Sequence, residues 1–581
     1  MNRTTKTRKH EEFRGHHSFL LFVFLRGFVA SCFIFGASAA TLTVDQVNPS
    51  TTPRVFKTIS EAEEAAMPGD TVVVHAGVYR EDVKLHHSGT PGNPIRFVAE
   101  PAGSVVVTGA DMILKLQRVE GTEPIYRVSW PHVFAIDYQD GKPVEFHPDS
   151  APLYGRAEEV IADEKLLLPC KDLSELRAAW KDRQNRLAPP VKNLGGPFAG
   201  MFAADTTYHV LYLWLGDGSD PNQHAMQACS RQEVFGINQY DSKEGVHDIE
   251  VSGFVFRYAA SFPQRAAVVL HGHDNFIHHC VIEKMAGTGV SVSGKISRCL
   301  IQDNGHTGGA VEGDHFLAEQ CVWRGNSWKP IDRGWEAGGA KVTESRHGKF
   351  DQCVFYRNGG PGLWFDVDCR DVDVTNCAFV ENELSGLFIE ICQDIRAENN
   401  YAMGNAMDVV GKMTDDAWSS GGIQVAESEH CVIRNNLCVG NRDGITLREI
   451  GPRPVKLRDE ETAYHVLDDR IEKNTIVENR QFAMGIWWDN VFFGGGKSEA
   501  SYDPLAQKLV IDGNEYDANG KFLYGAPWRA KSKKVETLKD FQGVTGFEKG
   551  GMINHASTNP PYSVEDRMVQ FAPFVMDGLK N

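Results

Sequence analysis

The chain has 581 residues, of which 42% are hydrophobic and 24% charged, a composition typical of a folded protein and not of a disordered one. Its net charge of -17 argues against a nucleic-acid-binding protein, because phosphate backbones are bound by basic surfaces. The length suits two to four ordinary domains or one long solenoid.

Residues 1–39 have the pattern of a secretory signal. Basic residues between Arg3 and Arg14 precede an apolar stretch that ends in the small-residue site Ala37-Ser38-Ala39. A membrane anchor is the alternative, but Arg26 interrupts the apolar run and leaves a piece too short to span a bilayer. We therefore expect cleavage after Ala39, no membrane span in the mature chain, and a secreted or periplasmic protein. Cleavage removes six basic and two acidic residues, which lowers the net charge to -21.

Residues 40–111 are predicted to form an N-terminal cap and the first coils of a β-solenoid. The segment 55–82 has the pattern of a short helix, a turn and a strand, and 88–111 adds two strand-like runs. The stretch 112–240 breaks the pattern, so we expect an inserted, mostly-β module with a short helix there. The main coils are expected at 241–495, followed by a C-terminal cap or tail at 496–581.

An internal repeat predicts the fold. From about residue 245, short β-rich runs recur at intervals of about twenty to forty residues, which is typical of a stacked architecture. The alternation has period two and shows no helical stripe. One position is occupied by small or amide side chains, namely Gly253, Cys280, Cys299, Cys321, Cys353, Cys377, Asn400, Asn436 and Asn474. Five residues later a second series reads Asn304, Asn326, Asn358, Asn382, Asn405, Asn441 and Asn479. Together these features predict a right-handed parallel β-helix with internal Asn and Cys ladders.

The twelve cysteines have two interpretations in an exported chain. Disulfides are the usual one. However, Cys32 leaves with the signal and the remaining number is odd, while five cysteines fall in register within the repeat. We therefore expect these five to be buried core residues rather than disulfide partners. A zinc site is disfavoured because no paired CxxC motif is present.

One face of the solenoid is predicted to carry the chemistry. After each Asn ladder a glycine starts a strand, as in GLWFD (362–366) and GLFIE (386–390), whose first and third residues are apolar and face the core. The second and fourth residues are therefore expected to face solvent. These include Lys341, Trp364, Phe388, Arg448, Trp487, Asp366, Glu390 and Asp489, and also Glu312 if Gly308 starts its strand.

Asp366 and Glu390 occupy equivalent positions on consecutive coils. Neighbouring strands lie about 4.8 Å apart, so the two carboxylates are expected at about the separation of a retaining glycosidase pair. Two close carboxylates repel, which separates their pKa values and suits a nucleophile and an acid. Solvated surface carboxylates or a calcium site are the alternatives.

The opening segment 55–111 resembles those of pectate-lyase-like, chondroitinase-B-like and β-helical glycosidase families. The stretch GLWFDVDCRDVDVTNCAFVENELSGLFIE (362–390) resembles the catalytic segment of β-helical glycoside hydrolases, in particular the β-xylosidases of glycoside hydrolase family 120. This resemblance, which covers residues 45–490 in outline, implies a parallel β-helix with an intercalated β-sandwich. It also implies an Asp nucleophile and a Glu acid/base one coil later, roles that fall on Asp366 and Glu390.

Other residues are candidate substrate contacts. Lys341 is expected to bind a sugar hydroxyl or to pair with Asp366. Trp364, Phe388 and Trp487 are candidate sugar platforms, and packing of each under an insertion loop is the alternative. Arg448 is expected about 10 Å from Glu390 by strand spacing, within reach of a substrate hydroxyl or carboxylate. Asp489 would belong to a distal subsite or be a plain surface acid. The insertions 326–339, 406–422 and 449–470 are expected to wall the cleft, with Trp335, Asp415, Asp416 and Trp418 as possible contacts.

The sequence thus predicts a secreted retaining glycoside hydrolase that acts on a plant- or algal-type poly- or oligosaccharide, without a cofactor unless calcium is bound. A polysaccharide lyase is the second hypothesis, with Lys341 and Arg448 as base and acid. Their backbones would lie about 19 Å apart, too far to act on one sugar. A non-catalytic carbohydrate-binding β-helix is the third hypothesis.

Overall fold

The computed structural model describes residues 39–47, 53–134, 138–139, 142–143, 156–187, 198–237, 245–329, 333–407, 420–449, 453–457, 460–488, 502–525, 535–554 and 559–571. The predicted signal segment, Asp415, Asp416, Trp418 and Asp489 lie outside these residues. Within them, none of the helices has the length and apolar character needed to cross a bilayer.

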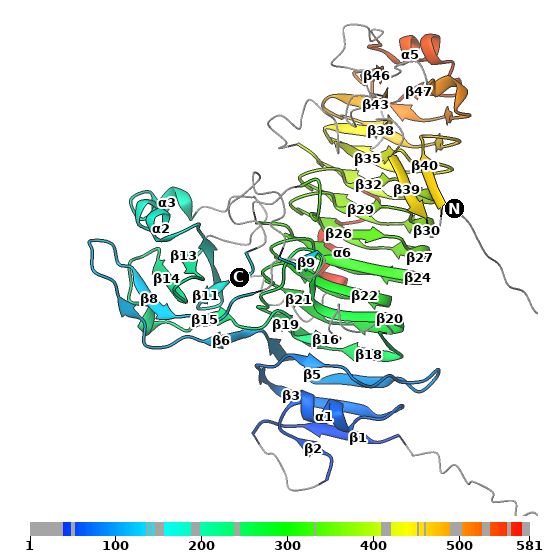
Figure 1. The fold of residues 1–581 in the computed structure, drawn as a ribbon. Coiled ribbons are helices and arrows are strands. Elements are labelled where there is room, and N and C mark those ends of the chain that lie inside the picture. The colour runs from blue at the N-terminus through cyan, green and yellow to red at the C-terminus, as the bar shows by residue number, and fades with distance from the viewer. Residues whose placement is uncertain are drawn as a thin grey trace, which may run out of the picture. The chain divides into compact units, whose positions relative to one another are not determined.

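Short strands repeat from coil to coil and pair in parallel with the equivalent strands of the neighbouring coils (Figure 1). Three ladders of such strands run along the chain, so the prediction of a parallel β-helix is confirmed. The first ladder carries the candidate site. It contains the N-terminal parts of β20 (Ala266–His278), β22 (Thr288–Ser297) and β24 (Gly309–Glu319), followed by β26 (Ala340–Thr343), β29 (Leu363–Asp366), β32 (Leu387–Glu390), β35 (Gly421–Ala426), β38 (Asp443–Glu449), β43 (Phe482–Trp488) and β46 (Phe522–Tyr524).

The second and third ladders complete each coil. The second has β18 (Ile249–Ser252), the C-terminal parts of β20, β22 and β24, then β27 (Arg346–Asp351), β30 (Arg370–Thr375), β33 (Gln393–Glu398), β36 (Val432–Arg434), β41 (Arg470–Glu472) and β44 (Val510–Asp512). The third has β19 (Phe254–Arg257), β21 (Val281–Glu283), β23 (Leu300–Gln302), β25 (Val322–Arg324), β28 (Val354–Tyr356), β31 (Ala378–Val380), β34 (Tyr401–Met403), β37 (Leu437–Val439), β42 (Thr475–Val477), β45 (Glu515–Tyr516) and β47 (Met552–Ile553). The core between the ladders is apolar.

The Asn ladder joins successive coils through buried side chains. Asn382 Nδ2 donates to the carbonyl of Phe355 (3.0 Å) and to Asn405 Oδ1 (2.9 Å), while its own Oδ1 accepts from Asn358. The same pattern recurs along the ladder, so the amides that a lone buried Asn would leave unsatisfied are paired. All eleven described cysteines are free and buried, as expected for the five in the repeat.

The coils continue past residue 495, where we expected only a cap or tail. β44 extends the second ladder, β45 and β47 extend the third, and β46 extends the first. The reason is that Asn514 prolongs the Asn ladder, since its Oδ1 accepts from the backbone N–H of Asn474 at 2.8 Å. The helix α5 (Leu538–Thr545) then packs on β46 through stacked Phe522 and Phe541 rings. The last described helix is α6 (Val564–Phe571).

The N-terminal coils are built by β1 (Thr41–Val44), β2 (Val55–Phe56), β3 (Thr71–Tyr79), β4 (Val83–Lys84) and β5 (Ile95–Thr108). The helix α1 (Ile59–Ala65) packs against β1 to β4. Thr58 and Glu61 form a capping box at its start, which satisfies N–H groups that would otherwise be unpaired. The predicted helix before the first coils is therefore present.

The chain between β5 and the main coils forms a separate sheet. It is ordered β6 (Ala110–Met112), β15 (Met226–Cys229), β11 (Val160–Ala162), β12 (Lys165–Pro169), β13 (Gly200–Asp205), β14 (Val210–Leu215), β8 (Tyr126–Ser129) and β7 (Gln117–Arg118). Its helices are α2 (Leu173–Trp180) and α3 (Arg183–Arg186). Its core includes Phe262 and Trp328 of the β-helix, so the two parts share one apolar cluster.

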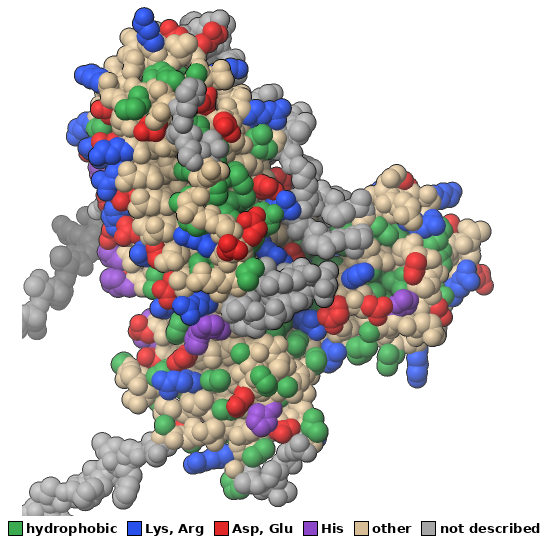
Figure 2. All heavy atoms as spheres, turned by 180° about the vertical axis from the view of Figure 1, so that it is seen from behind, with side chains coloured by type: hydrophobic (Ala, Val, Ile, Leu, Met, Phe, Trp, Pro, Cys, Tyr) green, Lys and Arg blue, Asp and Glu red, His purple; other side chains and the backbone are tan. Residues whose placement is uncertain are grey.

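The remaining elements are short. β16 (Phe235–Gly236) and β17 (Val246–His247) lead back into the coils, and two hairpins are formed by β9 (Tyr138–Gln139) with β10 (Lys142–Pro143) and by β39 (Arg453–Leu457) with β40 (Glu460–Tyr464). Two 3₁₀ turns lie at Pro221–Gln223 and Pro504–Ala506. On the face seen from behind, acidic and basic side chains are interspersed over the surface (Figure 2).

Candidate active site

The register of the first ladder places the two predicted carboxylates on neighbouring coils. Trp364 pairs with Phe388, and Asp366 and Glu390 are the last residues of the paired strands β29 and β32. Lys341 of β26 pairs with Trp364, and Thr343 pairs with Asp366. The prediction that Asp366 and Glu390 occupy equivalent positions on consecutive coils, with Lys341 one coil earlier, is therefore confirmed.

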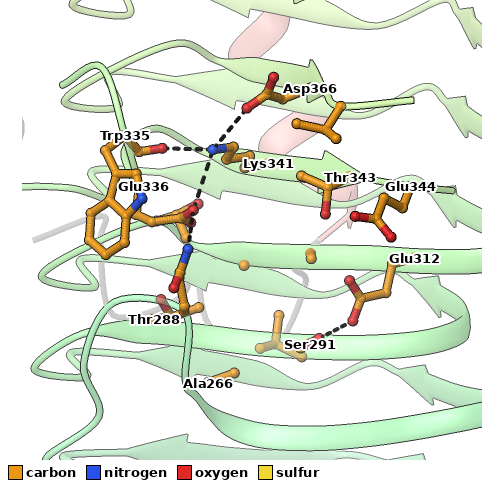
Figure 3. A pocket seen from close by; sticks show the side chains of 16 residues that line it. Ala266, Thr288, Ser291, Glu312, Trp335, Glu336, Lys341, Thr343, Glu344 and Asp366 are labelled. Carbon is orange, nitrogen blue, oxygen red and sulfur yellow. Dashed lines mark hydrogen bonds and ion pairs between the residues drawn. The ribbon is translucent and has the colours of Figure 1, made fainter. Parts of the chain in front are cut away.

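A cavity of about 450 Å³ opens over this ladder on the N-terminal side of Asp366 (Figure 3). Its walls come from β20, β22, β24, β26 and β29 and from the connection before β26. The charged residues that line it are Glu312, Glu336, Lys341, Glu344 and Asp366, and Trp335 supplies an aromatic wall. Trp335 thus lies where the insertion at 326–339 was expected to wall the cleft.

Lys341 connects the charged groups of the cavity. Its Nζ donates to the carbonyl of Trp335 at 2.8 Å and forms ion pairs with Glu336 Oε1 at 3.3 Å and Asp366 Oδ2 at 3.2 Å. The two contacts place those carboxylate oxygens within 6.5 Å of each other. Burial alone would lower the pKa of Lys341, but the negative charges of Glu336 and Asp366 outweigh it and raise that pKa. The ammonium group therefore stays charged between two carboxylates.

Glu390 lies behind the cavity wall rather than in the lining. Its side chain is 2% exposed, and its oxygens accept from Trp364 Nε1 (3.2 Å) and Arg448 Nη2 (2.7 Å). Arg448 also pairs with buried Glu427 at 3.3 Å. The expectation that Glu390 and Arg448 face solvent is therefore wrong: both are buried, they pair with each other, and aromatic side chains lie beside them.

The separation of two strand spacings expected between Arg448 and Glu390 holds for their backbones but not for their side chains. Strand spacing separates their backbones by two coils, but the long Arg448 side chain crosses that gap and reaches Glu390. Its guanidinium lies 5.5 Å from the ring of Phe388 and 5.8 Å from that of Trp487. Because it is wholly buried, Arg448 is not positioned to contact a substrate.

The three aromatic residues considered as sugar platforms are buried as well, which agrees with the alternative that they are packed. Trp364, Phe388 and Trp487 are at most 2% exposed. Trp364 stacks on Phe388 with a centroid distance of 5.6 Å, and Lys341 Nζ lies 4.0 Å from the Trp364 centroid. Large side chains in register on adjacent strands stack on one another, as Trp364 and Phe388 do. The ammonium group of Lys341 lies over the Trp364 ring, and the guanidinium of Arg448 lies near the Phe388 ring. These aromatics therefore position charged groups instead of offering an open face.

Sequence reasoning missed Glu336, which the structure brings to Lys341. It lies in the irregular segment before β26, where no strand register indicates side-chain direction. Its place within the 326–339 insertion, directly before a glycine-led strand, is the one signal that could have indicated it. Glu312 occupies the position expected if Gly308 starts its strand, since Gly309 pairs with Ala340.

Among the described residues, one group of side chains has the spacing of a metal site, namely Asp314, His315 and His347. The group is exposed, and Asp314 is hydrogen-bonded to His347 at 2.6 Å. The two imidazole rings stack at 22°, so their in-plane lone pairs lie in nearly parallel planes. This arrangement disfavours convergence of both rings on one cation.

Comparisons with known proteins agree with the fold. The family model described as a right-handed beta helix region matches residues 266–437. The uncharacterized protein YwoF of Bacillus subtilis (strain 168) is 34% identical over 89 residues, which are 15% of this chain and 18% of that protein. The matched stretch thus spans less than a fifth of that relative.

Three solved structures are similar over most of the chain. A structure of XylC in complex with xylose has a TM-score of 0.53 at 17% identity, covering 84% of this chain and 87% of that one. A glycoside hydrolase has a TM-score of 0.38 at 11% identity, covering 91% and 98%. The AlgE6 A-module, from a mannuronan C-5 epimerase of Azotobacter vinelandii, has a TM-score of 0.38 at 13% identity, covering 86% and 94%. Together, the family model and the XylC likeness establish that this chain is a right-handed parallel β-helix protein.

Proposed function

We propose that this protein is a carbohydrate-active enzyme that hydrolyses glycosidic bonds of a poly- or oligosaccharide with retention of configuration. The observation that carries the proposal is Asp366, which lines the cavity and is held by the charged Lys341, with Glu390 at the end of the next paired strand. The similarity to XylC, whose structure contains xylose, favours a sugar substrate.

In this mechanism Asp366 attacks the anomeric carbon and forms a covalent glycosyl-enzyme, while an acid protonates the departing oxygen. The same acid then takes a proton from the water that releases the sugar. Strand spacing of about 4.8 Å between β29 and β32 suits Glu390 for this acid/base role. The role requires the Glu390 carboxyl to leave Arg448 and turn toward Asp366 when a sugar is bound. Glu336, which also pairs with Lys341, is the other carboxylate near Asp366 and is therefore the alternative to Glu390 as the acid/base.

The geometry favours hydrolysis over a lyase reaction. A lyase based on Lys341 and Arg448 needs both at one sugar, but four strand spacings, about 19 Å, separate their strands. In addition, Arg448 is wholly buried, and the raised pKa of Lys341 disfavours the neutral amine that a base needs. A binding protein without turnover is the other alternative.

The test is turnover of aryl glycosides by residues 40–581, across xyloside, arabinofuranoside, fucoside, galactoside, glucoside and uronide substrates. We expect activity on one sugar class, lost in Asp366→Asn and Glu390→Gln. Asp373→Asn replaces an exposed carboxylate of β30, and Glu381→Gln replaces an exposed one that follows β31; both variants should retain activity. Binding without turnover on this panel and on polymers would support the binding alternative, and an ultraviolet-absorbing unsaturated product would support a lyase.

Azide rescue assigns the two roles. With Asp366→Ala and an activated substrate, azide should attack from the vacated side and give a glycosyl azide of inverted configuration. With Glu390→Ala it should give the retained configuration, because Asp366 still forms the intermediate. Rescue in Glu336→Ala instead would move the acid/base role to Glu336.

We also propose that the protein is exported after cleavage at Ala39 and works without a cofactor, since the two-carboxylate mechanism uses no metal ion. N-terminal sequencing of the protein recovered outside the cytoplasm tests the first point. Unchanged kcat/KM after chelation with EDTA tests the second, and restoration by calcium alone would contradict it.

A further inference from the structure

The cavity extends well beyond Asp366 toward the N-terminal coils. Ser291 of β22 and Glu312 of β24 line its other end (Figure 3). Ser293 pairs with Glu312, and the Gly309–Ala340 pair places Glu312 in register with Thr343, which itself pairs with Asp366. Two strand spacings, about 10 Å, therefore separate Glu312 from Asp366. One sugar unit at Asp366 leaves this far end unfilled.

The far end is a preorganised polar site. Ser291 Oγ donates to Glu312 Oε1 at 2.6 Å, and His271 Nε2 lies 2.7 Å from Ser291 Oγ and 3.0 Å from Glu312 Oε1. Burial alone would raise the pKa of Glu312, but its contacts with His271 and Ser291 outweigh that effect and lower it. Glu312 is thus an ionised acceptor with a fixed direction, about a quarter exposed to the cavity. Such a carboxylate is suited to accept from the hydroxyls of a sugar.

The charge of the lining selects against anionic sugars. Four carboxylates, Glu312, Glu336, Glu344 and Asp366, line the cavity with one lysine, and the described lining contains no arginine. A uronate at the far end would meet ionised Glu312 without a bidentate cation to bind its carboxylate. The hydroxyls of a neutral sugar, in contrast, can donate hydrogen bonds to these carboxylates or accept one from Lys341.

We propose that Ser291 and Glu312 form a second sugar-binding subsite for an uncharged sugar unit. The substrate is then a neutral oligosaccharide of at least two units, not a uronate chain. This inference rests on the proposed function only for the sugar at the Asp366 end.

Calorimetric titration of the full chain carrying Asp366→Asn tests the subsite without turnover. The probes are xylobiose, cellobiose and mannobiose, their monosaccharides, and digalacturonate. At least one neutral disaccharide should bind about ten-fold or more tightly than its monosaccharide, and more tightly than digalacturonate. Glu312→Gln should weaken disaccharide binding about ten-fold and leave monosaccharide binding unchanged. Glu381→Gln is the matched control and should change neither affinity.

Equal binding of mono- and disaccharides, tighter binding of digalacturonate, or no binding of any neutral disaccharide at millimolar concentration would overturn the subsite.

The inference and the proposed function fail differently. Hydrolysis of aryl glycosides without any chain-length effect would sink the subsite alone. Disaccharide binding that depends on Glu312, in a protein that cleaves no glycoside, would sink the hydrolase proposal alone.

Discussion

Replacement of Lys341 by methionine should damage both stability and the pH dependence of activity. Lys341 is 9% exposed and pairs with Glu336 and Asp366 at 3.3 and 3.2 Å. At the shorter distance Coulomb's law gives about 5 kcal/mol for an effective dielectric constant of about 20. Desolvation offsets part of this attraction in the intact site, but removal of the cation leaves two carboxylates facing each other in a cavity. Breaking a buried pair in this way typically lowers the free energy of unfolding by about 3–5 kcal/mol.

The sign of the pH effect follows from the same contacts. The neighbouring carboxylates raise the pKa of Lys341, so its stabilising contribution is present at neutral pH and is lost only in alkali, above the usual lysine value. Without the ammonium, Asp366 loses the positive charge that favours its ionised form. The acidic limb of the kcat/KM profile should therefore move up by about one to three pH units.

The assays are urea unfolding at pH 7 and a pH profile of kcat/KM on the aryl glycoside found active. The matched control is Lys295→Met, which removes a partly exposed lysine paired with Glu319 at 2.8 Å. Its cost should stay below about 1 kcal/mol, because exposed pairs contribute little. Equal stability of the two variants, together with an unshifted acidic limb in Lys341→Met, would refute the reasoning.

Three further outcomes are expected. Asn382→Ala removes four ladder hydrogen bonds and should lower the free energy of unfolding by about 4 kcal/mol. The control Asn185→Ala, at an exposed position, should change it by no more than about 0.5 kcal/mol. Similar losses for both variants in urea unfolding would contradict this prediction. Burial raises the pKa of Asp443 to about 6, so the native protein holds a proton there that the unfolded chain releases near pH 4. As the pH rises from about 4 to 6, the free energy of unfolding of the wild type should therefore fall by about 3 kcal/mol relative to that of Asp443→Asn. Parallel curves of unfolding free energy against pH for the two proteins would exclude this effect. Native protein of residues 40–581 should react with almost no thiol reagent and release eleven reactive thiols in denaturant without reductant; fewer would indicate disulfides.

The burial of the aromatic row changes how the candidate site is understood. Trp364, Phe388 and Trp487 hold Lys341, Glu390 and Arg448 through ring contacts and one indole hydrogen bond. The described residues that line the cavity are instead Trp335 and a mostly polar set on the N-terminal side of Asp366. Under the proposed function, variants of the aromatic row should act through the carboxylates and not through sugar affinity.

The sequence by itself determined the fold and the coil alignment of Asp366, Glu390 and Lys341. Both depend on period-two alternation and on ladders such as Cys353 with Cys377, which are local patterns that repeat and therefore reinforce one another. The Asn ladder extends further than expected, to Asn514. A single Asn prolongs the ladder there, although the surrounding sequence repeat is weak.

Only the tertiary structure decided which outward residues line the cavity and which are buried. Alternation assigns a side chain to the outer face of a strand, but it says nothing about what covers that face. Arg448 was expected at about two strand spacings from Glu390, yet its length and the low polarity around Phe388 and Trp487 bring the two charges into contact. Glu336 reaches Lys341 from an irregular segment, where direction depends on packing between distant parts of the chain and not on any repeat.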